Sequence, residues 1–164
     1  MKKSIEIVDY DLFRYKGKDS LLYVCLLVPD RTYPDMVLYD HKTVFSQMEK
    51  FETFKAHVDT LTRQEVIDFR DFFDGNILSD LAKFGKNIEW FEYVHEIVGE
   101  TEFRKMLYAK SRCGYCPLGA INNIDAFKVL ISNYNITSDI LYQLARNCRT
   151  EELEYVADMV NLLA

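Results

Sequence analysis

The sequence predicts an α+β fold that is predominantly helical, with a small N-terminal antiparallel sheet of two or three strands followed by about seven short helices. Up to residue 40, apolar residues alternate with polar ones or form short runs between turn residues, which is typical of strands. From residue 41, apolar residues recur every three or four positions, which is typical of amphipathic helices. We expect one domain over residues 1–164, with the sheet in residues 1–40 and the helices in residues 41–164.

The predicted strands begin with residues 4–15, whose alternation slips by one position at Val8 and indicates a bulge. Residues 21–28 are continuously apolar, as in a central strand, and residues 36–39 form a short third strand. If residues 21–28 instead have an unpaired edge, they can pair with a second chain. A homodimer through this strand is therefore one arrangement that the sequence allows.

The helical part starts with a stripe of apolar residues over 45–58, for which Asp40 is the expected N-cap. Thr62 and Glu65 have the spacing of a capping box, and we expect their helix to continue to Phe73. The last three helices carry similar apolar stripes and are expected to pack as a bundle or solenoid. The remaining expected helices are 77–84, 88–98 after Asn87, 103–110 after Thr101, 124–134, 138–147 and 151–163.

Composition and charge favour a cytoplasmic protein that binds another protein. The formal net charge is −6, which disfavours nucleic acid as a partner because phosphate binding needs an excess of Lys and Arg, and is compatible with a basic protein partner. Eleven tyrosines suit a binding surface, because the ring packs while the hydroxyl stays hydrated. The longest apolar run is far shorter than the roughly 20 residues that span a bilayer, and acids interrupt the N-terminus where a signal peptide would be apolar. We therefore expect no membrane partner.

The sequence Cys113-Gly114-Tyr115-Cys116 is the one local chemical motif. Two thiols at this spacing can form a redox pair or supply half of a zinc site. A helix precedes the motif where a redox fold would have a strand, and no second ligand pair follows for zinc. The remaining interpretation is a tight loop between helices with reduced thiols. No cofactor is expected, except zinc at Cys113 and Cys116 in the metal interpretation.

A block of basic residues surrounds this motif and contains no acid between residues 103 and 124. Together with nearby tyrosines, it could contact a small anion, a nucleotide or RNA, because guanidinium planes and tyrosine rings stack on bases. The alternative is an ordinary solvated helix face. The residues concerned are Arg104, Lys105, Tyr108, Lys110, Arg112 and Tyr115.

Motifs for catalysis are lacking. The sequence has no Gly-x-Ser-x-Gly, no phosphate-binding glycine loop and no dinucleotide fingerprint. Glu92 and His95 have the spacing of a di-iron ligand pair, but no second pair exists, so we expect His95 to be a partly buried packing residue.

These observations predict a non-enzymatic protein-binding module, by analogy a small acidic inhibitor such as a toxin-immunity or phage anti-defence protein. The expected contact faces are the acidic stretches 68–80 and 151–158. The alternative is a metal- or redox-responsive protein, or an enzyme, built on Cys113, Cys116 and the adjacent basic block. The binding residues predicted in the second acidic stretch are Glu151, Glu152, Glu154, Tyr155 and Asp158.

Overall fold

The computed structural model describes residues 6–8, 23–29, 37–43, 45, 48–71 and 73–163. This described part is predominantly helical, as predicted, and contains nine helices where about seven were expected. The side chains of the strand residues, and of residues 162 and 163, lie outside the described part.

Three short strands precede the helices: β1 (Glu6–Val8), β2 (Tyr23–Pro29) and β3 (Val37–Thr43). Among the described residues their backbones pair antiparallel in the order β1-β2-β3. The bulge predicted at Val8 and most of the connecting residues fall outside the described residues. The predicted N-terminal sheet, as an element packed on the helices, therefore stays a prediction.

The first two helices are α1 (Phe51–Val58) and α2 (Arg63–Asp68). The first helix starts at Phe51, so the prediction of Asp40 as its N-cap was wrong. The predicted capping box is confirmed: the Thr62 hydroxyl accepts the Glu65 N–H at 3.1 Å, and the Glu65 carboxylate accepts the Thr62 N–H at 3.0 Å. Both helices pack against α4 (Ile88–Val98).

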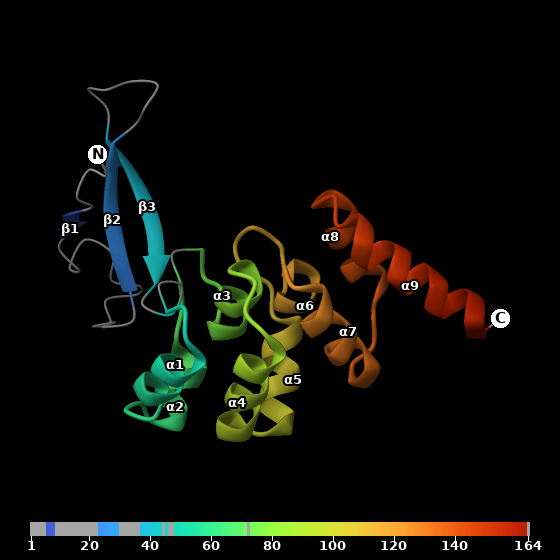
Figure 1. The fold of residues 1–164 in the computed structure, drawn as a ribbon, viewed down its shortest axis with the longest axis horizontal. Helices are drawn as coiled ribbons and strands as arrows, with labels where there is room; N and C mark the ends of the chain where they lie inside the picture. Colours follow the sequence, from blue (N-terminus) through green and yellow to red (C-terminus); the bar gives the residue numbers. More distant parts are fainter. Residues whose placement is uncertain are drawn as a thin grey trace.

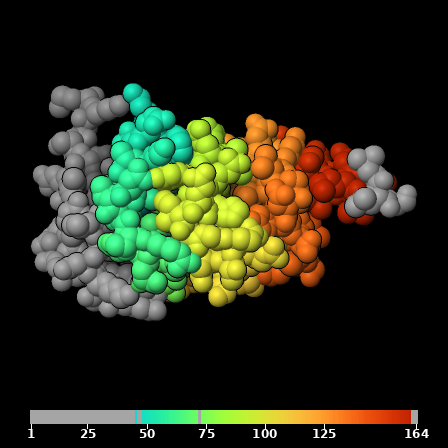
Figure 2. All heavy atoms as spheres, turned by 90° about the horizontal axis from the view of Figure 1, so that it is seen from below, coloured from blue at the N-terminus to red at the C-terminus, as the bar shows by residue number. Residues whose placement is uncertain are grey.

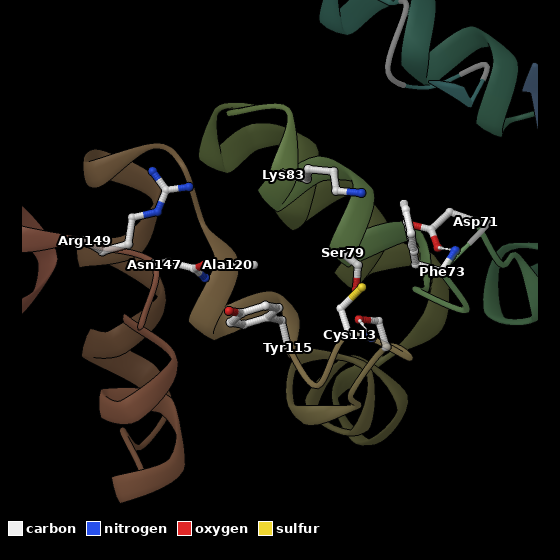
Figure 3. Close-up of a pocket in the computed structure, with 10 residues that line it drawn as sticks. Asp71, Phe73, Ser79, Lys83, Cys113, Tyr115, Ala120, Asn147 and Arg149 are labelled. Carbon is white, nitrogen blue, oxygen red and sulfur yellow. Dashed lines mark hydrogen bonds between the residues drawn. The ribbon is translucent and has the colours of Figure 1, made fainter. Parts of the chain in front are cut away.

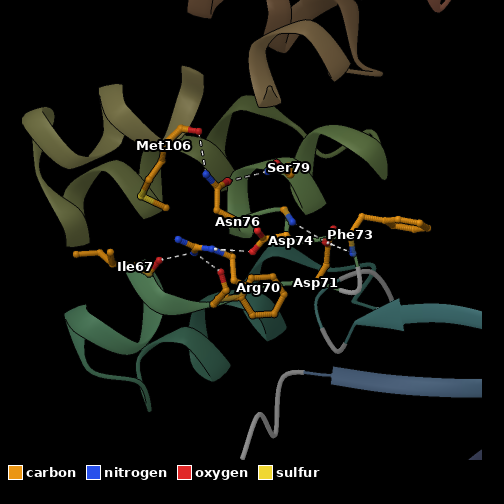
Figure 4. Close-up of polar contacts among 10 residues, drawn as sticks. Ile67, Arg70, Asp71, Phe73, Asp74, Asn76, Ser79 and Met106 are labelled. Atoms are coloured by element: carbon orange, nitrogen blue, oxygen red, sulfur yellow. Dashed lines mark hydrogen bonds and ion pairs between the residues drawn. The ribbon is translucent and has the colours of Figure 1, made fainter. Parts of the chain in front are cut away.

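A loop over residues 69–76 ends α2 earlier than predicted (Figure 4). The Asp71 carboxylate accepts the backbone N–H of Phe73 at 2.9 Å and of Gly75 at 2.7 Å. These bonds hold the chain in a tight turn that competes with the helix. The side chain of Asn76 caps α3 (Ile77–Lys83) and also donates to the Met106 carbonyl at 2.9 Å. The loop is thereby fixed to the helix that follows α4.

The buried acids of this segment correct one prediction. Asp71 is 5% exposed and Asp80 is 2% exposed, because the first holds the turn of the loop and the second lies on the packed side of α3. Residues 68–80 therefore do not form an exposed acidic face.

Beyond this loop the helices follow one another in chain order along the long axis of the molecule (Figures 1 and 2). Contacts run from α3 and α4 to α5 and α6, from α6 to α8, and from α8 to α9. The short α6 was not predicted, and α5 begins directly after Gly99, so Thr101 is not its cap. The remaining helices are α5 (Glu100–Tyr108), α6 (Pro117–Ala120), α7 (Ile124–Asn133), α8 (Ser138–Arg146) and α9 (Thr150–Leu163).

Two helix pairs, α3–α4 and α8–α9, are joined by the same turn. Gly85 (φ 68°) ends the first helix and Cys148 (φ 54°) ends the second, both in the left-handed region. In the first turn Lys86 N–H bonds the Leu81 carbonyl at 3.0 Å, and in the second Arg149 N–H bonds the Leu144 carbonyl at 2.9 Å. This is the Schellman pattern of a helix C-terminus. The two helix pairs thus share the same connecting turn.

The turns between paired helices also contact each other. The Asn123 amide donates to the Gly85 carbonyl at 3.3 Å, and the Asn122 N–H donates to the Ala82 carbonyl at 3.0 Å. The Arg149 guanidinium donates to the Asn122 side chain at 2.6 Å. The turns that precede α4, α7 and α9 therefore lie side by side. This arrangement brings Arg149 into contact with Asn122.

Candidate functional site

A cavity of about 350 Å³ lies between α3, the α8–α9 turn and two loops, residues 69–76 and residues 109–116 (Figure 3). The Arg112 N–H donates to the Phe73 carbonyl at 2.7 Å and joins the two loops. The lining residues are Asp71, Phe73, Ser79, Lys83, Ser111, Cys113, Tyr115, Ala120, Asn147 and Arg149.

Two cations, Lys83 and Arg149, line this cavity, and a third, Arg146, lies over a tyrosine ring of its lining. The Lys83 ammonium lies 4.7 Å from the centre of the Phe73 ring, and the Arg146 guanidinium lies 5.6 Å from that of Tyr115. Arg149 comes from the α8–α9 side, opposite Lys83 (Figure 3). Among the described residues, none of the three forms an ion pair with a carboxylate. The cavity is therefore a positively charged place on a negatively charged chain.

Two polar atoms at the cavity lack the partners that buried groups normally have. The Ser79 hydroxyl and the Arg149 Nε are buried, and within the described part of the chain neither makes a hydrogen bond. The one carboxylate among the described lining residues, Asp71, accepts hydrogen bonds from the backbone of its own loop, and burial raises the pKa of this carboxyl group. Both residues line the cavity, but the two unpaired atoms are closed to solvent, so each side chain would have to turn for that atom to meet a ligand.

The two cysteines of the predicted motif differ in their exposure to solvent. Cys113 is exposed at the cavity, whereas Cys116 is buried, and burial raises the pKa of the Cys116 thiol. The Cys116 N–H donates to the Gln143 amide oxygen at 2.9 Å, at the start of α6. In the described part of the chain, no group of three or more His, Cys, Asp or Glu side chains could hold a metal ion. Cys113 is therefore the thiol of this pair that a reagent reaches.

Three cations of the predicted basic block form ion pairs with acids outside the block. Two of these acids lie about one helical turn away on α5, and the third lies on α8. Arg104 pairs with Glu100 at 3.0 Å and Lys105 with Glu102 at 3.5 Å. Lys110 pairs with Asp139 on α8 at 2.8 Å. These pairs leave little free positive charge on α5 itself.

The remaining residues of the predicted basic block lie either on α5 or on the loop 109–116. The Tyr108 hydroxyl donates to the Asn135 carbonyl at 2.7 Å, on the side of α5 that faces α7 and the following loop. Tyr115 lines the cavity, and Arg112 is exposed on the same loop. Only this loop end of the predicted basic block therefore belongs to the cavity.

No family model, curated protein or solved structure matches the chain. Within the described residues, no helix has both the length and the apolar character needed to cross a membrane.

The acidic residues predicted on α9 fall on two sides of that helix. Glu151, Glu154 and Asp158 are exposed. Glu152 is 6% exposed, because it shares the packed side of the helix with Val156 one turn later, and it cannot belong to an exposed contact face. Tyr155, also predicted there, is partly buried under Lys128, whose ammonium lies 5.0 Å from its ring centre.

His95 is a partly buried packing residue, as expected, and connects three helices. Its ring stacks on Phe103 at 4.5 Å, and its Nε2 lies 2.8 Å from the Glu100 carboxylate. Glu100 also accepts hydrogen bonds from Arg104 at 3.0 Å and from the Tyr134 hydroxyl at 2.9 Å. Burial, together with the bond to Glu100, raises the pKa of Tyr134 to about 12. This network ties α4, α5 and α7 together.

Lys83, Arg146 and Arg149 were not among the predicted binding residues. The sequence contains a pattern that could have pointed to them. A Leu-Ala pair followed directly by a cation, with a second cation three residues later, occurs at Leu81 and again at Leu144. A cation in the last turn of a helix is favoured by the helix dipole, which explains Lys83 and Arg146. The similarity of these two stretches is hard to recognise because the second has Cys148 at the position where the first has Gly85.

Proposed function

We propose that this chain is a non-enzymatic protein-binding module whose terminal pair, α8–α9, docks on a basic surface of a protein partner. One observation carries the proposal: the last helix pair of the stack exposes large apolar side chains beside acids that have no described partner. Tyr142 on α8 is 64% exposed and Val160 on α9 is 59% exposed.

Large apolar side chains that remain exposed on neighbouring helices are typical of a surface that binds another protein. Here α8 exposes Leu141 and Tyr142, and the second half of α9 exposes Val160. Covering such surface is worth about 25 cal/mol per Å² of apolar area. Tyr142 also has the amphipathic ring that commonly anchors protein interfaces. Both properties support a protein partner on this end.

The acids of α9 indicate the charge of that partner. Glu151, Glu154 and Asp158 are exposed, and none of them forms an ion pair with a described residue. Their negative field would attract a Lys- or Arg-rich surface and repel an acidic one. A partner whose basic surface surrounds its active site would be inhibited by this contact, which is the inhibitor role expected from the sequence.

The same proposal includes the setting of the module. Cys113, Cys116 and Cys148 are free thiols, which supports a reducing, cytoplasmic location. We also propose that the N-terminal strands form a small sheet that packs on the helical part and completes an α+β fold. An antiparallel ribbon of this size needs such support to be stable.

The test begins with a photo-crosslinking amino acid placed at Tyr142 in the full-length chain, and in a second preparation at Glu96, an exposed residue of α4. Cross-linked proteins from the source cells are identified by mass spectrometry. We expect the Tyr142 probe to capture a basic protein that the Glu96 probe does not. The captured protein is then purified, and its affinity for the chain is measured by titration calorimetry.

Matched charge reversals decide whether the acids of α9 act in binding. The test variant carries Glu151→Lys, Glu154→Lys and Asp158→Lys. The control variant carries the same change of charge at three exposed acids of α4, Glu89, Glu92 and Glu96. We expect the test variant to weaken binding about tenfold or more, and more at low salt, with little change in the control. Equal effects, or a homodimer that Tyr142→Glu dissociates, would overturn the proposal.

A further inference from the structure

We infer that the cavity between the loops 69–76 and 109–116 and the α8–α9 turn binds a nucleoside monophosphate. This inference is independent of the docking proposed for the outer end of α8–α9. It uses different residues, and either can fail without the other.

The charge of the cavity suits a phosphate group. Arg149 bonds Asn122 through one terminal nitrogen, which leaves its buried Nε without a partner in the described part of the chain. A guanidinium with free N–H groups can bind two oxygens of one phosphate. Lys83 and Arg146 add two further cations that form no described ion pair. In a chain of net charge −6, two cations in the lining of one cavity and a third over its Tyr115 ring indicate an anionic ligand.

The aromatic lining suits a flat ring. Tyr115 comes from the loop 109–116 and Phe73 from the loop 69–76, and both line the cavity. Each ring already holds a cation, Arg146 at 5.6 Å and Lys83 at 4.7 Å, so the positive groups are fixed near the aromatic walls. A base stacked against such a ring is stabilised by roughly 1–3 kcal/mol. A ligand with a ring and a phosphate would use both features.

The remaining polar groups can satisfy the edge of a base or a ribose. The Ser79 hydroxyl is buried and has no hydrogen-bond partner in the described part of the chain, although a buried hydroxyl normally has one. The Asn147 side chain lines the other side of the cavity, close to Tyr115 (Figure 3). A carboxamide and a hydroxyl can both donate and accept, as a base edge requires. A ligand beside Asn147 would meet its carboxamide directly, and a change of the Ser79 rotamer would let that hydroxyl bond the ligand as well.

The size of the cavity limits the ligand. Its volume of about 350 Å³ is near the lower end of small-molecule sites, which span roughly 300–1,000 Å³. It suits one nucleotide rather than a dinucleotide. Among the described residues of the lining Asp71 is the only carboxylate, and its oxygens accept the N–H groups of Phe73 and Gly75. Its charge is therefore partly neutralised and directed at its own loop.

The experiment titrates the full-length chain with AMP, GMP, CMP and UMP by calorimetry, and separately with the matching nucleosides and with inorganic phosphate. We expect at least one monophosphate to bind about tenfold tighter than its nucleoside and than phosphate, because only the whole molecule uses both the ring and the cations. Ligand-observed NMR on the same samples should show base protons in contact with protein.

Variants assign the binding to the cavity. Arg149→Gln and Lys83→Gln should each weaken the bound monophosphate about fivefold or more, and Ser79→Ala should weaken it less. The controls are Lys55→Gln and Lys128→Gln, which remove cations that lie over Tyr93 and Tyr155 elsewhere. A thermal unfolding curve for each variant establishes that it is folded.

Three outcomes would overturn the inference. No monophosphate binds at concentrations up to about 10 mM. Phosphate binds as tightly as every nucleotide, so the ring contributes nothing. Arg149→Gln and Lys83→Gln weaken binding no more than the two control variants do.

Discussion

The amide oxygen of Gln143 accepts the backbone N–H of Cys116 at 2.9 Å, and this bond fastens α8 to the start of α6. Gly119, one turn along α6, has no side chain at the point where Gln143 lies. A Cβ added to Gly119 would come 2.2 Å from that oxygen and 3.0 Å from the Cβ of Gln143. The position of the cavity depends on this contact, because α8 carries the turn with Arg149.

We predict that Gly119→Ala destabilises the protein by about 2 kcal/mol, within the range for overpacked cores. Gln143 is 2% exposed and cannot move aside without losing its bonds to Cys116 and Asp139. The measurement is urea unfolding at neutral pH followed by far-UV circular dichroism. An unchanged midpoint and slope would contradict the prediction.

A double-mutant cycle tests the stated cause of that loss. Gln143→Ala alone should also destabilise, because it leaves the Cys116 N–H buried without an acceptor. In the double variant Gly119→Ala with Gln143→Ala, the clash is absent, so its loss should be clearly smaller than the sum of the two single losses. Additive losses would mean that the two residues do not collide.

Thr62→Ala should destabilise the protein by about 1 kcal/mol. The Thr62 hydroxyl accepts the Glu65 N–H at 3.1 Å, and its removal leaves a helix N–H without that acceptor. Thr62→Ser is the matched control, since serine keeps the hydroxyl and should cost far less. The same unfolding assay gives both values, and equal losses for alanine and serine would exclude the cap as the cause.

Cysteine labelling should separate the two thiols of the loop 109–116. Cys113 is exposed, whereas Cys116 is buried and has a raised pKa, so the thiolate of Cys116 is both rare and inaccessible. Iodoacetamide at pH 8, read by peptide mass mapping, should modify Cys113 in the native protein and Cys116 only after unfolding in urea. Similar native rates at the two positions would show that the burial of Cys116 is wrong.

The sequence predicted what depends on neighbouring residues. The capping box at Thr62, the helix that ends at Gly99 and the three C-terminal helices follow local spacing and capping rules, and the structure contains them. It missed α6, whose four residues are too short for a periodic signal.

The site was less predictable because it depends on contacts between distant residues. Lys110 appeared to belong to a free basic block, but its partner Asp139 is 29 positions away on α8. Arg149 reaches the cavity through the stacking of successive turns, which no local pattern encodes. Glu152 differs from its exposed neighbour Glu151 only in the side of α9 on which it lies.

Tyr134→Phe should weaken the protein in a pH-dependent manner. Hydrogen bonds from Arg104 and from the Tyr134 hydroxyl lower the pKa of Glu100 in the folded protein below its usual value of 4.5. A carboxylate with a depressed folded pKa contributes stability above its unfolded pKa and loses that contribution as the pH falls through the folded pKa. Tyr134 remains protonated and able to donate over this whole range, because its own pKa is about 12.

Removal of this donor should therefore raise the folded pKa of Glu100 and cost more stability at pH 5 than at pH 2.5. This window avoids the usual titration range of histidine. Tyr108→Phe is the matched control, because the Tyr108 hydroxyl donates to the Asn135 carbonyl, which does not titrate. The free energy of unfolding of each variant is measured in urea at both pH values. If the loss from Tyr134→Phe is the same at pH 5 and pH 2.5, its hydroxyl does not stabilise the Glu100 carboxylate, and Tyr134 contributes to the network of α4, α5 and α7 through packing alone.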